Sequence, residues 1–315
     1  MDGIHHITAI ASDPQANLDF YQILLGQRLV KKTVNFDDPG TYHFYFADEI
    51  GSPGTILTFF PWPGAVRGRR GNGEVAATAY TIHPGSIDYW RKRLADHGIT
   101  PGERQMRFGV DVIPFQDPDG MIIELITNDA PASIQTWQEG PIPAEHVLRG
   151  FYSATLWVGD AQPTADLLTG SLGYTFAGQE GRRYRFQVPG DAPGHIIDLL
   201  ERPGELYGRL GAGSVHHIAF RANDDAAQAE YLRTLRGNGY NVTPVKDRQY
   251  FHSIYFRAPS GVLFEIATDP PGFLTDETTA ELGSGLKLPP WLESQRPRIS
   301  KILPEVKTSA VSRSG

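Results

Sequence analysis

The sequence predicts an α+β fold made of four copies of one unit, each a strand, a helix and several further strands. Three observations predict this fold. Alternating apolar runs, which are typical of strands, are followed by Asp or Ser residues that can cap a helix. This order recurs four times in 315 residues. Each unit also closes with a strand that a glycine opens. Such internal repetition indicates a unit that packs against its own copies.

The first unit begins with GIHHITAIASD, residues 3–13, whose apolar run predicts a strand that ends before Asp13. A helix is expected next, over DPQANLDFYQILLGQ. Pro14 would take its first position and Gly26 would lie near its end, as is common in helices. Several short strands follow and end in SPGTILT.

The other three units repeat this order from starts near Val75, Gly150 and Val215. Their openings read VAATAYTIHPGSIDYWRKRLADHG, GFYSATLWVGDAQPTADLLTGSLG and VHHIAFRANDDAAQAEYLRTLRGNG. In units three and four the helix is expected to open at Asp160 and Asp224.

The closing strands share a polar position, the fourth residue after the opening glycine. The four residues are Thr58, Glu124, Asp198 and Glu265. Side chains alternate along a strand, so this position should face the same way in every unit. A carboxylate in an apolar strand is costly to bury unless it is paired or bound to a metal.

The repeats divide the chain into four segments. Residues 1–130 would hold the first pair of units, and 131–149 would be a linker. Residues 150–270 would hold the second pair. A Pro-rich tail, 271–315, would follow with one apolar clamp, LPPWL, and disorder is expected after Lys307.

Composition narrows the class of protein. A net charge of −7 without a long basic run argues against nucleic acid or a membrane surface as the partner. The absence of cysteine excludes disulfides, thiolate metal sites and a cysteine nucleophile. No signal peptide or membrane span is recognised, so a cytoplasmic protein is expected. The sequence does not count subunits, and a homo-oligomer is compatible with it.

The chain resembles the vicinal oxygen chelate superfamily of glyoxalases, bleomycin-resistance proteins and extradiol dioxygenases over nearly its whole length. The opening HHIT, the phrases LVKKTVNFDDPGTYHFYF and SPGTILTFFPWP, the later HHIAFR and the tail's LPPWLE are similar to ring-cleaving dioxygenases of the hydroquinone type. The resemblance implies βαβββ units that form two half-open barrels, with units 1+4 and 2+3 paired. It also implies a metal held by first and last strands.

Two histidine doublets, His5–His6 and His216–His217, occupy matching first strands. Adjacent strand residues face opposite sides, so one member of each doublet can point at a metal. Counting back from the capping residues matches His5 with His216 and His6 with His217. The count does not show which member of each doublet binds the metal. The resemblance implies that the second histidines are the ligands, and that His5 and His216 face elsewhere as supporting or structural residues.

Pairing units one and four would join His6, His217 and Glu265, with Thr58 as a weak fourth position. Two imidazoles and one carboxylate suit non-haem Fe(II), and Mn(II) accepts the same set.

Pairing units three and four would instead join Ser153, Asp198, His217 and Glu265. That arrangement would leave His6 with Glu124, which is too few ligands for a site. The 1+4 pairing is therefore preferred.

The resemblance also implies five residues that shape the active site: His5, Thr8, His216, Arg248 and Tyr255. Tyr255 would hydrogen-bond the substrate or oxygen, and Arg248 would hold an anionic form. His252 is a further acid or base on proximity alone. The acids Glu124 and Asp198 would hold their own barrel together through hydrogen bonds.

The expected function is Fe(II)-dependent, extradiol-type ring cleavage of a hydroquinone, substituted hydroquinone or related dihydroxybenzene with O₂. One alternative is a glyoxalase-type metal isomerase or transferase, which normally uses four protein ligands, so Thr58 argues against it. The other is a metal-free resistance protein that binds an aromatic compound. The set of His6, His217 and Glu265 argues against that alternative.

Overall fold

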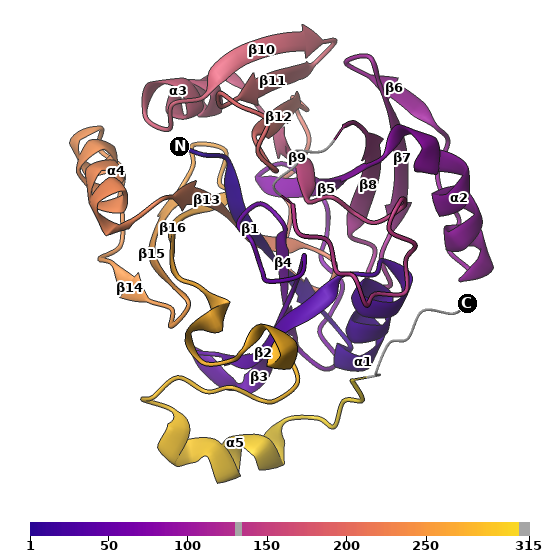
Figure 1. Cartoon of the computed structure of the whole chain (residues 1–315). Coiled ribbons are helices and arrows are strands. Elements are labelled where there is room, and N and C mark those ends of the chain that lie inside the picture. The colour runs from indigo at the N-terminus through magenta and orange to yellow at the C-terminus, as the bar shows by residue number, and fades with distance from the viewer. Residues whose placement is uncertain (130–133, 309–315) are drawn as a thin grey trace.

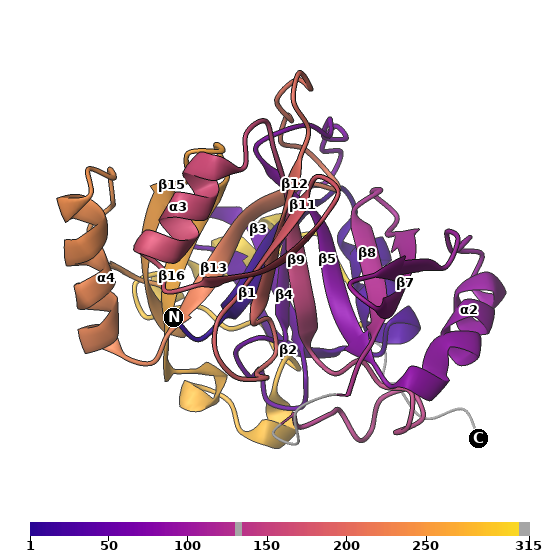
Figure 2. The same ribbon diagram turned by 90° about the horizontal axis from the view of Figure 1, so that it is seen from above.

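The computed structural model describes residues 1–129 and 134–308. Two strongly curled sheets, each of eight strands, lie side by side, and α2, α3 and α4 lie on their outer sides (Figures 1 and 2). The predicted α+β fold of four repeated units is confirmed. The disorder expected after Lys307 concerns residues that, from 309 on, lie outside this description.

The 1+4 sheet joins the first and last units in the strand order β14-β15-β16-β13-β1-β4-β3-β2. Its strands are β1 Ile4–Ala11, β2 Arg28–Asn35, β3 Asp38–Ala47, β4 Ile56–Pro61, β13 Val215–Ala222, β14 Lys246–Asp247, β15 Phe251–Arg257 and β16 Leu263–Pro271. The antiparallel pairing of β1 with β13 joins units that are far apart in the chain.

The 2+3 sheet has the corresponding order β10-β11-β12-β9-β5-β8-β7-β6. Its strands are β5 Glu74–Ile82, β6 Gln105–Arg107, β7 Val110–Gln116, β8 Ile122–Thr127, β9 Phe151–Val158, β10 Thr175–Glu180, β11 Arg183–Gln187 and β12 Ile196–Glu201. The predicted pairing of units 1+4 and 2+3 is therefore confirmed.

Each unit carries one helix between its first and second strands. Among the described residues, the α-helices are α1 Pro14–Leu18, α2 Ile87–Asp96, α3 Gln162–Gly170, α4 Asp225–Gly237 and, in the tail, α5 Arg296–Ile302. As predicted, α1 begins at Pro14, and the Asp13 side chain caps it by accepting two backbone N–H groups. Beyond α1 the chain continues as a wider π-helix, Asp19–Leu24.

The polar position of the closing strands has the same register in all four units. In the parallel pairs Thr58 lies beside Thr8, Glu124 beside Ala79, Asp198 beside Thr155 and Glu265 beside Ala219. This equivalence confirms the predicted repeat and places each polar residue at one depth of its half-barrel.

The two sheets are hydrogen-bonded to each other near their first strands. Ile4 N–H donates to Gly194 O at 3.0 Å, and Phe151 N–H donates to Gly54 O at 2.8 Å. At Gly194, with φ +75, a Cβ would lie 2.8 Å from the Cβ of Ile4, so this contact needs glycine.

The tail crosses the 1+4 sheet and is anchored to β2 by a buried ion pair. The Lys31 ammonium lies 2.5 Å from Glu277 Oε2 and from Asp276 Oδ1. Leu288 and Leu292 of the predicted LPPWL clamp are buried. Tail and sheet therefore form one packed body.

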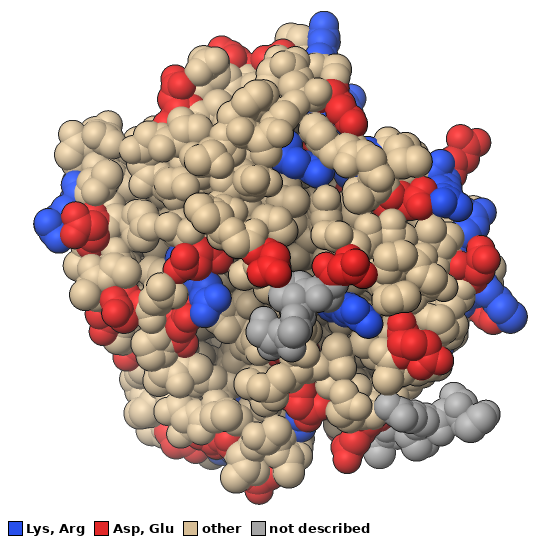
Figure 3. Space-filling view, turned by 45° about the horizontal axis from the view of Figure 1, so that its top comes forward, with Lys and Arg blue, Asp and Glu red and all other residues tan. Residues whose placement is uncertain are grey.

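The segment boundaries drawn from the sequence remain a prediction, although none of the described residues 134–149 lies in a helix or strand. Within residues 1–129 and 134–308, every helix is too short or too polar to cross a membrane. On the face shown in Figure 3, acidic and basic side chains are interspersed.

Candidate metal centre

Two β-bulges interrupt the pairing of β1 with β13, one at each histidine doublet. On β1 the register passes from Ile4 to His6, and on β13 it passes from Val215 to His217. His5 and His216 are therefore the extra residues of the two bulges. A bulge re-aims the side chains around it, and such features are common next to active sites.

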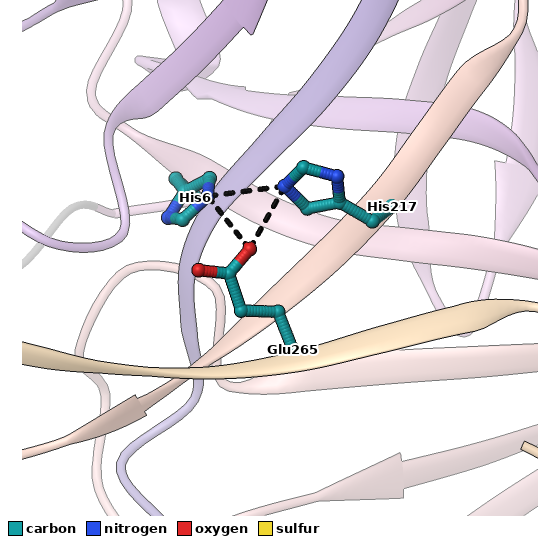
Figure 4. Close-up of side chains that lie close together, drawn as sticks. All are labelled: His6, His217 and Glu265. Carbon is teal, nitrogen blue, oxygen red and sulfur yellow. Dashed lines mark hydrogen bonds and ion pairs between the residues drawn. The ribbon is translucent and has the colours of Figure 1, made fainter. Parts of the chain in front are cut away.

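His6, His217 and Glu265, here called the His–His–Glu cluster, converge inside the 1+4 barrel from β1, β13 and β16 (Figure 4). Glu265 Oε2 lies 3.3 Å from His6 Nε2 and 2.8 Å from His217 Nε2. The two Nε2 atoms are 3.4 Å apart. All three side chains are buried.

The donor atoms of the cluster fit a divalent cation. Glu265 Oε2 has no hydrogen-bond partner among the described residues, although it is fully buried between two imidazoles. Its other oxygen, Oε1, accepts a hydrogen bond from Ser253 Oγ. Two imidazoles and one carboxylate on one side of an ion are the donor set of many non-haem Fe(II) sites, and Mn(II) also accepts it.

Protonation in the cluster favours metal binding. Burial lowers the pKa of His217, so its imidazole is neutral at pH 7. Burial alone would raise the pKa of Glu265, but His6 and His217 outweigh it and hold that pKa well below the usual value. A neutral imidazole and an ionised carboxylate are the forms that bind metals.

The first histidine of each doublet supports the second. His5 Nδ1 lies 2.9 Å from His6 Nδ1, and His216 Nδ1 lies 2.8 Å from His217 Nδ1. With Nε2 directed into the cluster, Nδ1 of each ligand would carry the proton and donate it to the neighbouring ring. These contacts agree with the expected supporting role of His5 and His216, and the bulges set where the two rings lie.

A cavity of about 290 Å³ opens beside the cluster. The side chains that line it are mainly aromatic or ionisable: His6, Asn35, Phe36, Asp37, His43, Tyr45, Phe60, His216, His217, Thr243, Lys246, Arg248, Phe251, Tyr255 and Leu263. This volume lies at the lower end of the range for small-molecule pockets. Of the five expected active-site residues, His216, Arg248 and Tyr255 line the cavity, whereas His5 and Thr8 are buried behind it.

Arg248 connects the two walls of the cavity. Its Nε donates to the Tyr255 hydroxyl at 3.1 Å, and its Nη2 donates to Asp37 Oδ2 at 3.0 Å. Burial, reinforced by the charge of Glu265, raises the pKa of Tyr255. The phenol therefore keeps its proton and can donate it to a ligand in the cavity.

Two further cavity residues, His43 and Tyr45, were missed in the sequence. His43 Nε2 lies 2.8 Å from Thr58 Oγ1, and its Nδ1 lies 2.9 Å from the Tyr45 hydroxyl. Their spacing of two in TYHFYF, on a strand next to the one that carries Thr58, was the available signal. Thr58 also donates to Thr8 Oγ1, so its hydroxyl is committed to neighbours in this fourth position.

His252, singled out by proximity, lies away from the cluster. Its side chain is 37% exposed, and its Nδ1 lies 2.7 Å from Asp225 Oδ1 at the start of α4. The residue does not line the cavity.

The corresponding position of the 2+3 barrel holds arginines. Arg107 makes a two-pronged pair with Glu124 at 2.6 and 2.8 Å. Asp198 accepts from Arg185 at 2.8 and 3.0 Å and from Arg183 at 3.2 Å. These contacts agree with the expected hydrogen-bonding role of both acids. Guanidinium groups thus stand where the 1+4 barrel gathers its imidazoles.

The chain is similar to known proteins over nearly its whole length. The model of the Glyoxalase/Bleomycin resistance protein/Dioxygenase superfamily matches residues 3–125 and 146–266. A Bacillus subtilis (strain 168) protein named as a ring-cleaving dioxygenase, MhqO, is 48% identical over 299 residues, which cover 95% of each chain. The chlorohydroquinone/hydroquinone 1,2-dioxygenase of Sphingobium indicum is 35% identical over 311 residues, 96% of each chain.

The fold also matches a solved structure over nearly its whole length. A crystal structure of a protein from Bacillus subtilis subsp. subtilis strain 168, described as a dioxygenase, superposes with a TM-score of 0.93 at 46% identity. The match covers 98% of each chain.

Proposed function

The chain belongs to the Glyoxalase/Bleomycin resistance protein/Dioxygenase superfamily, and we propose that it is an extradiol-type ring-cleaving dioxygenase that opens a hydroquinone or substituted hydroquinone with O₂. Its metal would be Fe(II), held by His6, His217 and Glu265. Mn(II) is the second metal that this donor set accepts.

The convergence of the His–His–Glu cluster at one side of a small aromatic cavity carries the proposal. Held by these three residues, a metal would keep open positions for small ligands, which is the arrangement of facial-triad oxygenases. The names of the relatives support the same reaction class and a hydroquinone substrate.

The side chains of the cavity would bind and orient the ring. Phe36, Phe60 and Phe251 form apolar walls, which favour an aromatic ligand over a polar one. Tyr255 would donate a hydrogen bond to an oxygen of the ligand. Arg248, fixed by Asp37, would hold a deprotonated ring hydroxyl through its charge.

Bound Fe(II) would supply the Lewis acidity and the electron transfer that activate ring and oxygen. The protein holds its ligands in one geometry through their neighbours. His5 and His216 fix the rings of His6 and His217, and Ser253 fixes the carboxylate. Partners of this kind are part of a metal site, because they set the orientation and basicity of its ligands.

Oxygen uptake tests the proposed reaction. Protein loaded with Fe(II) under nitrogen is mixed with aerated hydroquinone, methylhydroquinone or chlorohydroquinone in an oxygen electrode. We expect uptake of one O₂ for each ring opened. Lack of uptake with this panel and with catechol, by protein that contains stoichiometric iron, would contradict the proposed function.

Metal analysis tests the ligand assignment independently of turnover. We expect His217→Ala to lose stoichiometric iron, because a single imidazole and one carboxylate remain. His252→Ala is a matched control, since His252 lies outside the cavity and should leave iron content unchanged. Full iron content in His217→Ala would show that the metal lies elsewhere.

A further inference from the structure

Four buried side chains form a continuous line of hydrogen bonds from the cavity wall to β1. The Tyr45 hydroxyl lies 2.9 Å from His43 Nδ1, and His43 Nε2 lies 2.8 Å from Thr58 Oγ1. Thr58 Oγ1 lies 2.8 Å from Thr8 Oγ1. Tyr45 and His43 line the cavity, whereas Thr58 and Thr8 are fully buried.

The proton positions along this line follow from its two ring groups. Burial lowers the pKa of His43 well below its ordinary value. The imidazole is therefore neutral, with one nitrogen that donates and one that accepts. Burial raises the pKa of Tyr45, so the phenol retains its proton. Because Thr58 donates to Thr8, it accepts from His43 Nε2, and His43 Nδ1 is left to accept from the Tyr45 hydroxyl.

The rest of the line is then fixed by counting protons. With Nδ1 accepting, the imidazole proton is on Nε2 and goes to Thr58. Thr58 has a single hydroxyl proton and donates it to Thr8. Thr8 is an acceptor in this bond, so its own hydroxyl proton stays available. A buried hydroxyl proton is strongly favoured to find an acceptor.

Thr8 lies where that proton can serve a ligand. It is two residues from His6 on β1, and side chains two apart share one face of a strand. In β13 its antiparallel partner is His217. The free donor is thus on the barrel side of β1, beside His217 of the cluster.

We propose that His43 is a positioning residue, and that the line Tyr45 → His43 → Thr58 → Thr8 makes the Thr8 hydroxyl a fixed donor to an oxygen bound beside the His–His–Glu cluster. The identity of that oxygen as a phenolic one rests on the proposed function. The line replaces a fourth protein ligand at Thr58 with an oriented hydrogen bond.

The 2+3 barrel offers a comparison. Its residue equivalent to Thr58 is Glu124, which is bound to Arg107. Pro114 of β7 lies opposite Glu124, whereas in the 1+4 sheet Tyr45 of β3 lies opposite Thr58. The line of donors thus accompanies the barrel that carries the cluster.

Anaerobic titration of iron-loaded protein with 4-nitrophenol tests the proposal. The absorption of this probe distinguishes phenol from phenolate, so it reports both affinity and the form bound. We expect Thr58→Val to weaken binding about tenfold and to shift the absorption of the bound probe, because the Thr8 hydroxyl is no longer oriented toward the bound oxygen and part of that hydrogen bond is lost. Thr58→Ser keeps the hydroxyl and should bind as the unaltered protein does.

If Thr58 only fills space, the opposite effects on probe binding are expected, because Val preserves the shape of Thr and Ser leaves a gap. Normal probe binding by Thr58→Val, with weakened binding by Thr58→Ser, would overturn the proposal. Thr78→Val is a matched control, since it removes a buried strand hydroxyl of the 2+3 sheet that has no hydrogen-bond partner among the described residues.

A double-mutant cycle tests whether His43 transmits the effect. Tyr45→Phe removes the first donor, and Tyr80→Phe is its control in the other sheet. Because the groups act in series, Tyr45→Phe combined with Thr58→Val should weaken binding about as much as either change alone. A loss of probe affinity of about a hundredfold in the double variant would mean that the residues act independently, and would contradict the proposed line of hydrogen bonds.

The two proposals fail separately. If iron-loaded protein binds the probe but consumes no O₂ with hydroquinones, the proposed function fails, and the probe titrations still decide the line of donors. If O₂ is consumed normally while Thr58→Val binds the probe unchanged, only the line of donors fails.

Discussion

The same strand position has three different tasks in the four units, and its neighbours decide which. Glu265 faces two imidazoles, whereas Glu124 and Asp198 face arginines. Thr58 faces His43 and Thr8. A buried carboxylate must be paired with a cation or a metal, so the residue type alone could not distinguish the site from its counterparts.

Ser253→Ala should weaken metal binding without abolishing it. Ser253 donates to Glu265 Oε1 from within the protein and leaves Oε2 directed at the cluster. Loss of such a partner typically lowers metal affinity about 10- to 100-fold. Competition with a chelator measures the change. Ser260→Ala is a matched control, because its buried hydroxyl lies outside the cavity lining. Unchanged affinity in Ser253→Ala would show that the carboxylate needs no such support.

At the scale of the strand, the bulges matter as much as the histidines. The β5–β9 pair of the 2+3 sheet carries them too, since its register skips Ala76 and Tyr152. The two β-bulges are thus present in both barrels, but only in the 1+4 barrel do histidines stand at them. A bulge is a matter of pairing between two strands, which hydrophobic alternation within one strand does not reveal.

Glu124→Ala should destabilise the fold while leaving the metal content intact. The change leaves the Arg107 guanidinium without its partner inside the 2+3 barrel, where both side chains are nearly buried. Breaking a buried pair on one side typically costs about 3–5 kcal/mol in the free energy of unfolding. Urea denaturation measures it. Asp96→Ala, which breaks the exposed pair with Lys92, should cost about 0.5 kcal/mol or less. Equal effects of both changes would refute this account.

The whole molecule unites units that are distant in the chain. His6 lies in the first unit, while His217 and Glu265 lie in the fourth. The proposed metal centre can therefore form only when β1 pairs with β13, and the middle units connect the two partners. The tail closes over the same sheet through Lys31.

Residues 1–130 expressed alone should bind no stoichiometric iron. This half lacks His217 and Glu265, and it leaves β1 without its partner β13. Co-expression with residues 134–315 should restore iron binding if the halves reassemble. Iron analysis of the purified protein measures both. Stoichiometric iron in the N-terminal half alone would contradict the pairing on which the site depends.

The metal-free protein should lose stability as the pH falls below about 6.5. Burial lowers the pKa of His43 well below that of a free histidine. Below about pH 6.5 this imidazole is therefore protonated in the unfolded chain while it stays neutral in the folded chain. Stability therefore rises with pH in this window. Between pH 7.5 and 5.5 the His43 contribution reaches at most about 1.4 kcal/mol, the free energy of protonating an imidazole in the unfolded chain alone.

Urea midpoints at the two pH values measure this loss. It should shrink by that amount in His43→Gln, which has no group that titrates. His97→Gln is the control, because His97 is exposed on the end of α2. An identical loss in His43→Gln and in the unaltered protein would contradict a neutral, buried His43.

The sequence by itself determined the fourfold repeat, the start of each unit and the shared polar position, because alternation, capping residues and turn glycines are local signals. The resemblance added the pairing of units and the second histidine of each doublet. Only the tertiary structure decided how the first histidines act and that His43 and Tyr45 join the site. Those facts depend on bulges between strands and on side chains from β3 that meet β4 across a sheet. Cross-strand contacts of this kind leave no periodic trace in one strand, so no local pattern could have shown them.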